Sequence, residues 1–406
     1  MGSAISFIVR VHTTFSPAKV ALNPDPLQIG ILSTGKLSAH ALIAPVKSHP
    51  DIEVYAVASR DEEKVKKFAK KHDIPKTYHG KNAYQDLLDD PRLDAVYIPL
   101  PNSMHYEWTI KALNAGKHVL VEKPIASTPE EAREMYELAD SLNLVLLEGI
   151  HTRSLFPYSL SMKASLRNNR FHPALQRVKA IIDSGELGKL KHMSAKALIP
   201  IQRSDQLYVP SDFDLAKGSV MDIGCYDVDI LRYLAGSEPI GVGSVTYTPS
   251  PKAQNMDKIV EGVLEFPGDV TGTFSTDSAL PNLLGVIPQF DFSLTVECEE
   301  GSIKLSNYMV PQIHHSITVT KTTAGKKRVE KLYKPAPGSG APGEEWWSTF
   351  RYQLEAFVQK VRGGNPPQWV TKEDSVSILV WLQKVYEKMG LDPRPASKYY
   401  LETRAD

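Results

Sequence analysis

Short apolar runs alternate with amphipathic helical patterns between Leu27 and Leu147. Apolar runs of this length are typical of parallel strands buried on both faces. Parallel neighbours need a crossover connection, and repeated β-α units with right-handed crossovers form a doubly wound parallel sheet. We therefore expect an α/β domain over residues 27–149. Its predicted strands span residues 27–32, 53–58, 95–99, 118–121 and 144–147, and its helices residues 36–48, 61–72, 83–89, 103–115 and 129–142.

The sequence pattern changes beyond about residue 186, where strand-like runs follow one another without intervening helices. This pattern favours antiparallel pairing, so residues 150–395 should form an α+β domain with a large, mainly antiparallel sheet. Residues 396–406 are expected to be a C-terminal tail. The predicted strands span residues 242–247, 259–266, 270–274, 290–296, 302–305 and 317–320, and helices at 171–184, 222–235, 344–361 and 372–388 would cover one face.

Two segments do not fit this plan. Residues 1–26 contain Pro17, Pro24 and Pro26 and are expected to be a disordered tail. Two alternatives remain for this segment. The absence of acidic residues up to Val20 is also compatible with a transit peptide, and the opening Met-Gly-Ser-Ala-Ile-Ser is also compatible with N-myristoylation. Residues 154–170 have no acidic residue and no regular period, so we expect a surface insertion, with a phosphate contact as the weaker alternative.

The amino-acid composition limits the classes of binding partner that we expect for this chain. Lys plus Arg and Asp plus Glu both total 47, so the formal net charge is zero, which gives no support to nucleic acid or an anionic membrane as partner. No apolar run approaches the roughly 20 residues that cross a bilayer. Two cysteines, Cys225 and Cys298, are too few for a disulfide framework and indicate a reducing, cytoplasmic compartment. The histidines are scattered, so no metal site is predicted.

A degenerate dinucleotide fingerprint follows the first predicted strand. A Rossmann domain needs small residues at three positions, for a tight turn, for backbone approach to the pyrophosphate and for helix packing on the sheet. Ser33, Gly35 and Ser38 hold these positions. The start of the next helix would present backbone N–H groups to the pyrophosphate. The candidate cofactor contacts here are Ser33, Thr34, Gly35, Lys36 and Leu37.

The end of the second predicted strand indicates which nicotinamide cofactor is bound. An acidic residue at this tip usually binds the ribose 2′-hydroxyl of NAD, whereas an arginine can hold the 2′-phosphate of NADP. Ser59 and Arg60 occupy the tip, and Asp61 is better explained as the N-cap of the next helix. We therefore predict NADP in preference to NAD.

The fourth strand ends abruptly in Glu122, Lys123 and Pro124. Ligands gather at the carboxyl ends of parallel strands, so Lys123 is expected where a ligand binds. A desolvated lysine can acquire a lowered pKa and take part in proton transfer. By itself the pattern is equally compatible with a surface lysine at a strand end.

With these features the chain resembles the glucose-fructose oxidoreductase, inositol dehydrogenase and rhizopine-catabolism (Gfo/Idh/MocA) family. The resemblance covers about residues 27–390 and rests on Glu122-Lys123-Pro124, on Pro101-Asn102-Ser103-Met104-His105, and on Asp222 followed four residues later by Tyr226. A tyrosine at that position is similar to the dihydrodiol and D-xylose dehydrogenase branch. The family implies a Rossmann domain followed by an open-faced antiparallel sheet used for substrate binding and for assembly into a homodimer or homotetramer.

The resemblance also implies site residues. Tyr226 would relay the proton with Lys123 beside it, although Lys123 could itself be the base, and Asp222 would bind substrate or orient the lysine. Further cofactor contacts would be Pro101, Asn102, His105, Glu122 and Lys123, and substrate contacts would be His151, Arg153, Asp222 and Tyr226. Asn102 and His105 could instead be helix caps. His151 stands where the dihydrodiol branch has a tryptophan, which argues against an aromatic diol.

The resemblance therefore implies an NADP-dependent dehydrogenase acting on a hydroxyl carbon of a sugar, polyol or dihydrodiol, most like a lactone-forming D-xylose 1-dehydrogenase. A non-catalytic NAD(P)-binding regulator of the same fold is the alternative, and a scaffold that uses only its sheet is a third. A pure sensor has no need for Lys123, Asp222 and Tyr226 together.

Overall fold

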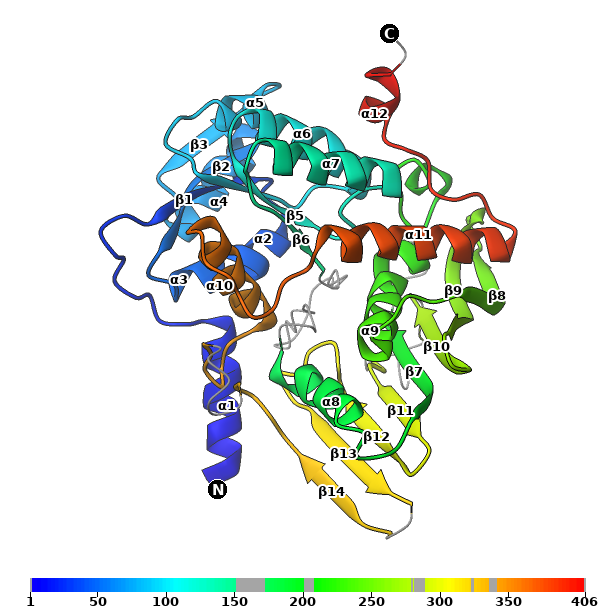
Figure 1. Cartoon of the computed structure of the whole chain (residues 1–406). Helices are drawn as coiled ribbons and strands as arrows, with labels where there is room; N and C mark the ends of the chain where they lie inside the picture. The colour runs from blue at the N-terminus through cyan, green and yellow to red at the C-terminus, as the bar shows by residue number, and fades with distance from the viewer. Residues whose placement is uncertain are drawn as a thin grey trace. The chain divides into compact units, whose positions relative to one another are not determined.

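The computed structural model describes residues 2–150, 172–200, 208–278, 280, 289–322, 325–335 and 342–404, with side chains from Phe7 onward. The chain forms two compact units, which Figure 1 shows with their helices and strands labelled. The first unit comprises Met1–Ile150, Glu345–Val376 and Ala396–Asp406, and the second comprises His151–Glu344 and Ser377–Pro395. Helix α11 (Lys372–Met389) contributes residues to both.

The first unit contains a parallel sheet of six strands in the order β3-β2-β1-β4-β5-β6, the doubly wound order of dinucleotide-binding domains. The predicted fold class is therefore confirmed. The strands are β1 (Leu27–Leu32), β2 (Ile52–Ser59), β3 (Lys76–His79), β4 (Ala95–Ile98), β5 (His118–Glu122) and β6 (Leu146–Gly149). The helical segments are α2 (Lys36–Ser38), η1 (Ala39–Ile43), α3 (Ala44–Lys47), α4 (Glu62–His72), α5 (Ala83–Leu88), η2 (Asn102–Met104), α6 (His105–Asn114) and α7 (Pro129–Ser141).

Close packing holds the helices against the centre of this sheet. Ile29 and Ile31 of β1 have no exposed surface. Between them, Gly30 has no room for a side chain, because an added Cβ would lie 2.7 Å from a methyl carbon of Leu87 in α5. A larger residue at this position would therefore force the buried Leu87 side chain to shift.

The second unit contains eight strands in the order β14-β13-β12-β11-β7-β10-β9-β8, paired antiparallel except for β7 and β10. This confirms the expected large, mainly antiparallel sheet. The strands are β7 (Leu190–Leu198), β8 (Gly241–Ser250), β9 (Ala253–Phe266), β10 (Val270–Asp277), β11 (Leu294–Cys298), β12 (Gly301–Ser306), β13 (Ser316–Lys321) and β14 (Lys327–Glu330). The helical segments are α8 (Pro173–Asp183), η4 (Pro210–Asp212), η5 (Val220–Gly224) and α9 (Cys225–Ala235).

Alternate residues of this sheet meet different surroundings. Met193 of β7 and Phe274 of β10 are fully buried, and α9 packs against these two strands. Ser194 and Thr273, which pair across the same two strands, remain partly exposed. The apolar face is thus the face covered by the helix.

The chain ends differ from the prediction. Within residues 1–26, expected to be a tail, the structure contains helix α1 (Gly2–Phe15), and the Thr14 hydroxyl donates to the carbonyl of Trp346 at 2.8 Å. The C-terminal segment forms α12 (Lys398–Glu402), and the Ser397 amide before it donates to the Glu131 carboxylate at 2.7 Å. Long-range hydrogen bonds order both ends, and such contacts leave no local pattern. The predicted insertion at 154–170 lies outside the described residues.

The prediction that the helix at 344–361 covers the antiparallel sheet is wrong. Helix α10 (Thr349–Val361) belongs to the first unit, where it packs against α3. The Gln353 side-chain amide donates to the carbonyl of Glu148 at 3.1 Å. An amphipathic pattern shows that a helix buries one face but not which partner covers it.

Candidate active site

The first unit places predicted site residues at the carboxyl ends of β4 and β5. Lys123 follows β5, is only 3% exposed, and donates its backbone N–H to the Gly149 carbonyl at 3.2 Å. Glu122 is equally buried and accepts a 2.5 Å hydrogen bond from the Tyr97 hydroxyl. Lys123 is therefore not a solvated surface lysine. Its burial and its place at a strand end are those expected of a residue that faces a ligand.

His105 ties the loops after β4 and β5 together. Its Nε2 lies 2.9 Å from the Leu100 carbonyl and its Nδ1 lies 2.8 Å from the Pro124 carbonyl. Carbonyl oxygens only accept, so both contacts are hydrogen bonds when both ring nitrogens carry hydrogen. His105 is fully buried and Asn102, which begins η2, is 3% exposed. The contacts of His105 therefore fix the backbone beside Lys123.

The fingerprint loop lies between β1 and α2. Gly35 is the N-cap of α2 in an extended conformation, and its N–H donates to the Ser33 hydroxyl at 3.1 Å. Ser38, the third small residue, is fully buried. Ser33, Thr34, Gly35 and Leu37 are partly exposed and Lys36 is exposed. The loop thus combines a buried packing position with accessible groups ahead of a helix, as a pyrophosphate site requires.

Asp61, beside the β2 tip, is the N-cap of α4, as predicted. Its carboxylate accepts from the Lys64 amide at 3.0 Å and forms an ion pair with the Lys64 ammonium at 3.1 Å. The hydrogen bond from the Lys64 amide is the main cause of its lowered pKa. Arg60, one residue earlier, is exposed, and Ser59 is partly exposed. The strand tip thus offers a hydroxyl and a guanidinium, while the nearest carboxylate is engaged by its own helix.

The second unit carries the other two predicted catalytic residues at the start of α9. Asp222 lies in η5 and is 5% exposed, and Tyr226, one helical turn later, is 2% exposed. The Asp222 amide donates to the Gly218 carbonyl at 2.7 Å. The Tyr208 hydroxyl donates to Asp222 Oδ2 at 3.0 Å. The structure therefore places Asp222 and Tyr226 on one turn and adds Tyr208 to them.

A fully buried ion pair holds the backbone before this turn. Asp257 of β9 accepts from the Val220 amide at 2.7 Å and from the Tyr386 hydroxyl at 3.0 Å, and it pairs with the Arg394 guanidinium. Both charged side chains have no exposed surface. Burial raises the pKa of Asp257, and the charge of Arg394 opposes that shift. Gly218 has φ +139, and a Cβ there would lie 2.5 Å from the Arg394 guanidinium.

The sequence analysis did not identify Tyr208, Asp257 or Arg394. Asp257 and Arg394 are 137 residues apart and belong to no local motif. Two predicted substrate contacts, His151 and Arg153, lie outside the described residues. The remaining predicted residues divide between the units, with Lys123 in the first and Asp222 and Tyr226 in the second.

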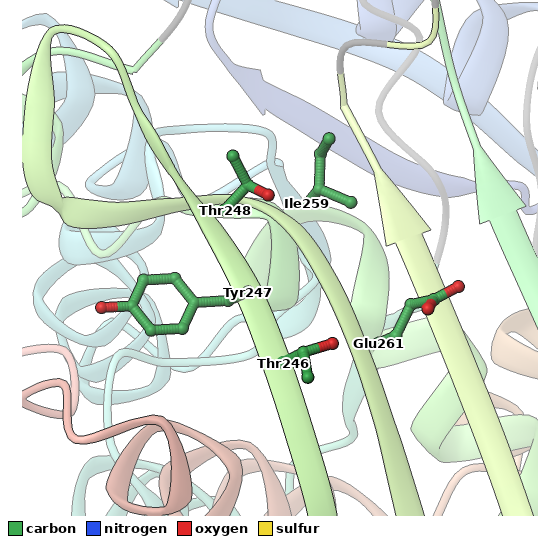
Figure 2. Close-up of a pocket in the computed structure, with 5 residues that line it drawn as sticks. All are labelled: Thr246, Tyr247, Thr248, Ile259 and Glu261. Atoms are coloured by element: carbon green, nitrogen blue, oxygen red, sulfur yellow. The ribbon is translucent and has the colours of Figure 1, made fainter.

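A separate pocket of about 180 Å³ lies on the outer strands β8 and β9, lined by Thr246, Tyr247, Thr248, Ile259 and Glu261. Figure 2 shows Tyr247 on the opposite side of β8 from Thr246, as expected for neighbours along a strand. The Ser275 hydroxyl of β10 donates to Glu261 at 3.0 Å. None of the predicted catalytic or cofactor-binding residues lines this pocket.

Among the described residues, no helix combines the length and apolar character needed to span a membrane. Nor do they contain a group of three or more histidine, cysteine, aspartate or glutamate side chains placed to hold a metal ion.

Known proteins resemble this chain over most of its length. It is 28% identical over 362 residues to D-xylose 1-dehydrogenase (NADP(+)) 2 of Haloferax volcanii, covering 89% of this chain and 97% of the relative. It is 31% identical over 267 residues to the trans-1,2-dihydrobenzene-1,2-diol dehydrogenase of Sus scrofa, covering 64% and 71% respectively. The crystal structure of a 3-ketoreductase from Actinomadura kijaniata with NADP and TDP-benzene has the same fold, with a TM-score of 0.70, 21% identity, and coverage of 90% of this chain and 98% of that one.

Two family models match in succession. A model described as an oxidoreductase family with an NAD-binding Rossmann fold matches residues 27–150, and the model of the GFO/IDH/MocA C-terminal domain matches residues 175–304. Together they cover more than half of the chain. The chain therefore belongs to the GFO/IDH/MocA family of oxidoreductases.

Proposed function

We propose that this protein is an NADP-dependent dehydrogenase that oxidises a hydroxyl-bearing carbon of a sugar, polyol or dihydrodiol. The observation that carries the proposal is the burial of Lys123 at the carboxyl end of β5. An amine held at 3% exposure at a strand end is suited to proton transfer and poorly suited to a purely solvated role. The family assignment supplies the reaction class.

The first unit fits a nicotinamide dinucleotide phosphate. Backbone groups of the loop Ser33–Leu37 would hold the pyrophosphate, and Ser59 and Arg60 would hold the 2′-phosphate. Pro101, Asn102, His105, Glu122 and Lys123 would surround the nicotinamide end. NADP bound in this way supplies the hydride acceptor. NAD is disfavoured, because the carboxylate beside the β2 tip, that of Asp61, already caps α4.

The hydroxyl proton is assigned to the chain's own side chains. Tyr226 would accept it as the preferred relay, or Lys123 would accept it. Asp222 would bind the substrate hydroxyl. These roles require buried polar groups close together in sequence, and Asp222 in η5 and Tyr226 at the start of α9 support the proposal because both are buried and lie one helical turn apart.

We propose an aldose as the substrate, with D-xylose the first candidate and oxidation at C1 giving the lactone. The D-xylose dehydrogenase of Haloferax volcanii covers more of the chain than the dihydrodiol dehydrogenase does. His151 takes the place of the tryptophan expected for an aromatic diol, which also favours an aldose. We propose His151 and Arg153 as substrate contacts. A cytoplasmic location agrees with the two free cysteines, and we propose assembly as a homodimer or homotetramer through the sheet.

Steady-state assays with purified protein test this function. NADP⁺ is supplied with D-xylose, other aldoses, polyols and a dihydrodiol, and NADPH formation is followed. We expect turnover with an aldose and a kcat/KM at least tenfold higher with NADP⁺ than with NAD⁺. A protein that binds NADP⁺ tightly yet reduces it with no member of the panel would instead be a non-catalytic regulator.

A further inference from the structure

Tyr208 lies next to Asp222 in the second unit, and contacts with the β8–β9 hairpin hold it in place. Its side chain is 7% exposed and belongs to a buried cluster with Ala253 and Met256, against which Phe213 packs. Its carbonyl accepts a 2.7 Å hydrogen bond from the Ser250 hydroxyl. The tip of the β8–β9 hairpin therefore fixes both the ring and the backbone of Tyr208.

The hydroxyl of this anchored ring meets the Asp222 carboxylate at 3.0 Å. Burial, together with the negative charges of Asp222 and Asp257, raises the pKa of Tyr208 well above its usual value. The phenol therefore keeps its proton and can only donate to the carboxylate. A hydrogen bond to a charged acceptor is stronger and more directional than one between neutral groups.

The backbone of Asp222 is restrained independently of its side chain. The Asp222 amide is bonded to the Gly218 carbonyl, and Asp257 receives the Val220 amide while paired with Arg394. These contacts set where the α-carbon of Asp222 lies. They do not by themselves set the rotation of its carboxylate about the side-chain bonds, and the hydrogen bond from Tyr208 restrains that rotation.

We propose that Tyr208 is a positioning residue that holds the Asp222 carboxylate in the orientation used during proton transfer. This inference rests on the proposed function of Asp222. Tyr208 acts through Asp222, so its hydroxyl affects the chemical step and leaves cofactor binding unchanged. Its ring packs in the hairpin cluster and accounts for its structural role, which a phenylalanine would preserve.

Four variants test the proposal: Tyr208→Phe, Asp222→Asn, the double variant and Tyr308→Phe. The last is a matched control, because the fully buried Tyr308 also donates its hydroxyl to a buried aspartate, Asp227. Tyr208→Phe should lower kcat for D-xylose about tenfold, with KM and NADP⁺ affinity changed less than twofold. Tyr308→Phe should lower the melting temperature and leave kcat unchanged.

The double variant separates positioning from packing. If Tyr208 acts through Asp222, adding Tyr208→Phe to Asp222→Asn should cause no further loss of turnover. A crystal structure of Tyr208→Phe should show the Asp222 carboxylate rotated or in several rotamers, with the backbone of η5 in place. This second measurement does not depend on the choice of substrate.

The outcomes distinguish this inference from the proposed function. An inactive Asp222→Asn beside a fully active Tyr208→Phe, with the Asp222 rotamer unchanged, would overturn the positioning role and leave the catalytic assignment standing. A fully active Asp222→Asn would overturn both. Equal losses of kcat in Tyr208→Phe and Tyr308→Phe would show a general effect of deleting a buried hydroxyl and would also reject the proposal.

Discussion

The two units hold their candidate site residues by different means. In the first unit, the contacts that position these residues are made with backbone carbonyls. The Lys123 amide donates to the Gly149 carbonyl, and the His105 ring lies between the carbonyls of Leu100 and Pro124. In the second, side chains from distant parts of the chain make these contacts: Tyr208 reaches Asp222, and Asp257 paired with Arg394 receives the Val220 amide.

This difference has consequences for mutation. A site at strand ends is fixed by the sheet itself, so replacing one of its side chains should remove chemistry without disturbing the fold. A site at a helix start held by buried polar partners should lose stability when those partners change.

The largest effect is expected for the proton-transfer residues. Lys123→Met and Tyr226→Phe should each lower kcat about 10²–10⁴-fold, the usual contribution of a positioned acid or base. NADP⁺ affinity, measured by fluorescence titration, should change little, because neither group is proposed to contact the pyrophosphate or the 2′-phosphate. Near-native turnover in either variant would remove that residue from the proposed mechanism.

Breaking the buried ion pair of the second unit should cost stability. Arg394→Met leaves the Asp257 charge uncompensated with no exposed surface, and we expect a loss of about 3 kcal/mol in the free energy of unfolding. Urea denaturation measures it. The control is Arg133→Ala, which removes an exposed 2.9 Å pair with Glu130 and should cost under about 0.5 kcal/mol. Similar losses in the two variants would mean that the buried pair has no special structural weight.

The proposed cofactor preference rests largely on the exposed Arg60 side chain at the tip of β2. Arg60→Ala should lose about 2 kcal/mol of NADP⁺ binding free energy, the scale of a charge-assisted contact, and little for NAD⁺. Isothermal titration with both cofactors makes the comparison. If the variant lost affinity equally for both, Arg60 would not be holding the 2′-phosphate.

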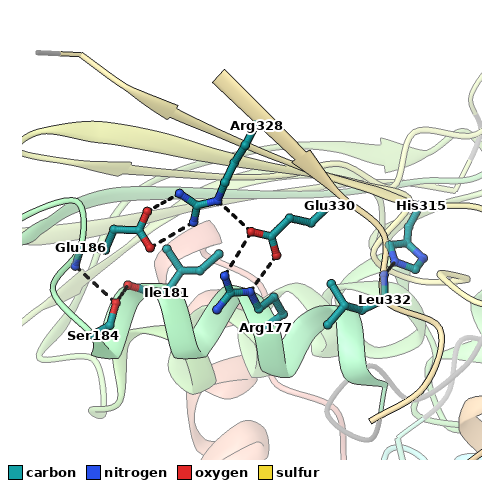
Figure 3. A network of polar contacts seen from close by, with 8 residues as sticks. All are labelled: Arg177, Ile181, Ser184, Glu186, His315, Arg328, Glu330 and Leu332. Atoms are coloured by element: carbon teal, nitrogen blue, oxygen red, sulfur yellow. Dashed lines mark hydrogen bonds and ion pairs between the residues drawn. The ribbon is translucent and has the colours of Figure 1, made fainter. Parts of the chain in front are cut away.

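The smallest effect is expected at the outer edge of the second sheet, where polar contacts join β14 to α8 (Figure 3). Glu330 pairs with Arg177 at 2.7 Å and with Arg328 at 2.8 Å, and Arg177 is the main reason that its pKa falls to about 2. A depressed folded-state pKa stabilises the protein above the unfolded value of about 4.3, and this stability is lost as pH falls toward 2.

Glu330→Gln tests this directly. Because the pairs are partly exposed, the variant should be less stable than the parent by under about 1 kcal/mol at pH 7, and this difference should shrink between pH 5 and pH 2. Thermal unfolding across that range measures it, and 1 M NaCl should reduce the difference at pH 7. A difference independent of both pH and salt would exclude an electrostatic origin.

The same contrast explains what could be predicted from the sequence. The central strands of the first unit are apolar runs, and β1, β2, β4, β5 and β6 were all expected. Strand β3, Lys-Thr-Tyr-His, was missed because this edge strand has exposed ends and no apolar run. Lys123 was predicted because a strand end is a local pattern.

The support around Asp222 could not be predicted in this way. Tyr208, Asp257 and Arg394 come from three separate segments, and their roles exist only once the sheet and the C-terminal segment pack together. From the sequence alone, a buried arginine cannot be distinguished from an exposed one, because the burial of a charge depends on its partner. Helix α10 was assigned to the second unit instead of the first for the same reason, because its amphipathic pattern does not show which element covers its apolar face.

Isotope transfer tests oxidation at C1 of the sugar together with the role of Lys123 in proton transfer. The purified protein is incubated with NADP⁺ and D-xylose carrying deuterium at C1, and the reduced cofactor is analysed by mass spectrometry. We predict that the reduced cofactor carries one deuterium per turnover, and that Lys123→Met forms this labelled cofactor at least a hundredfold more slowly. Reduced cofactor without deuterium, or equal rates for the two proteins, would contradict oxidation at that carbon with Lys123 in the proton transfer.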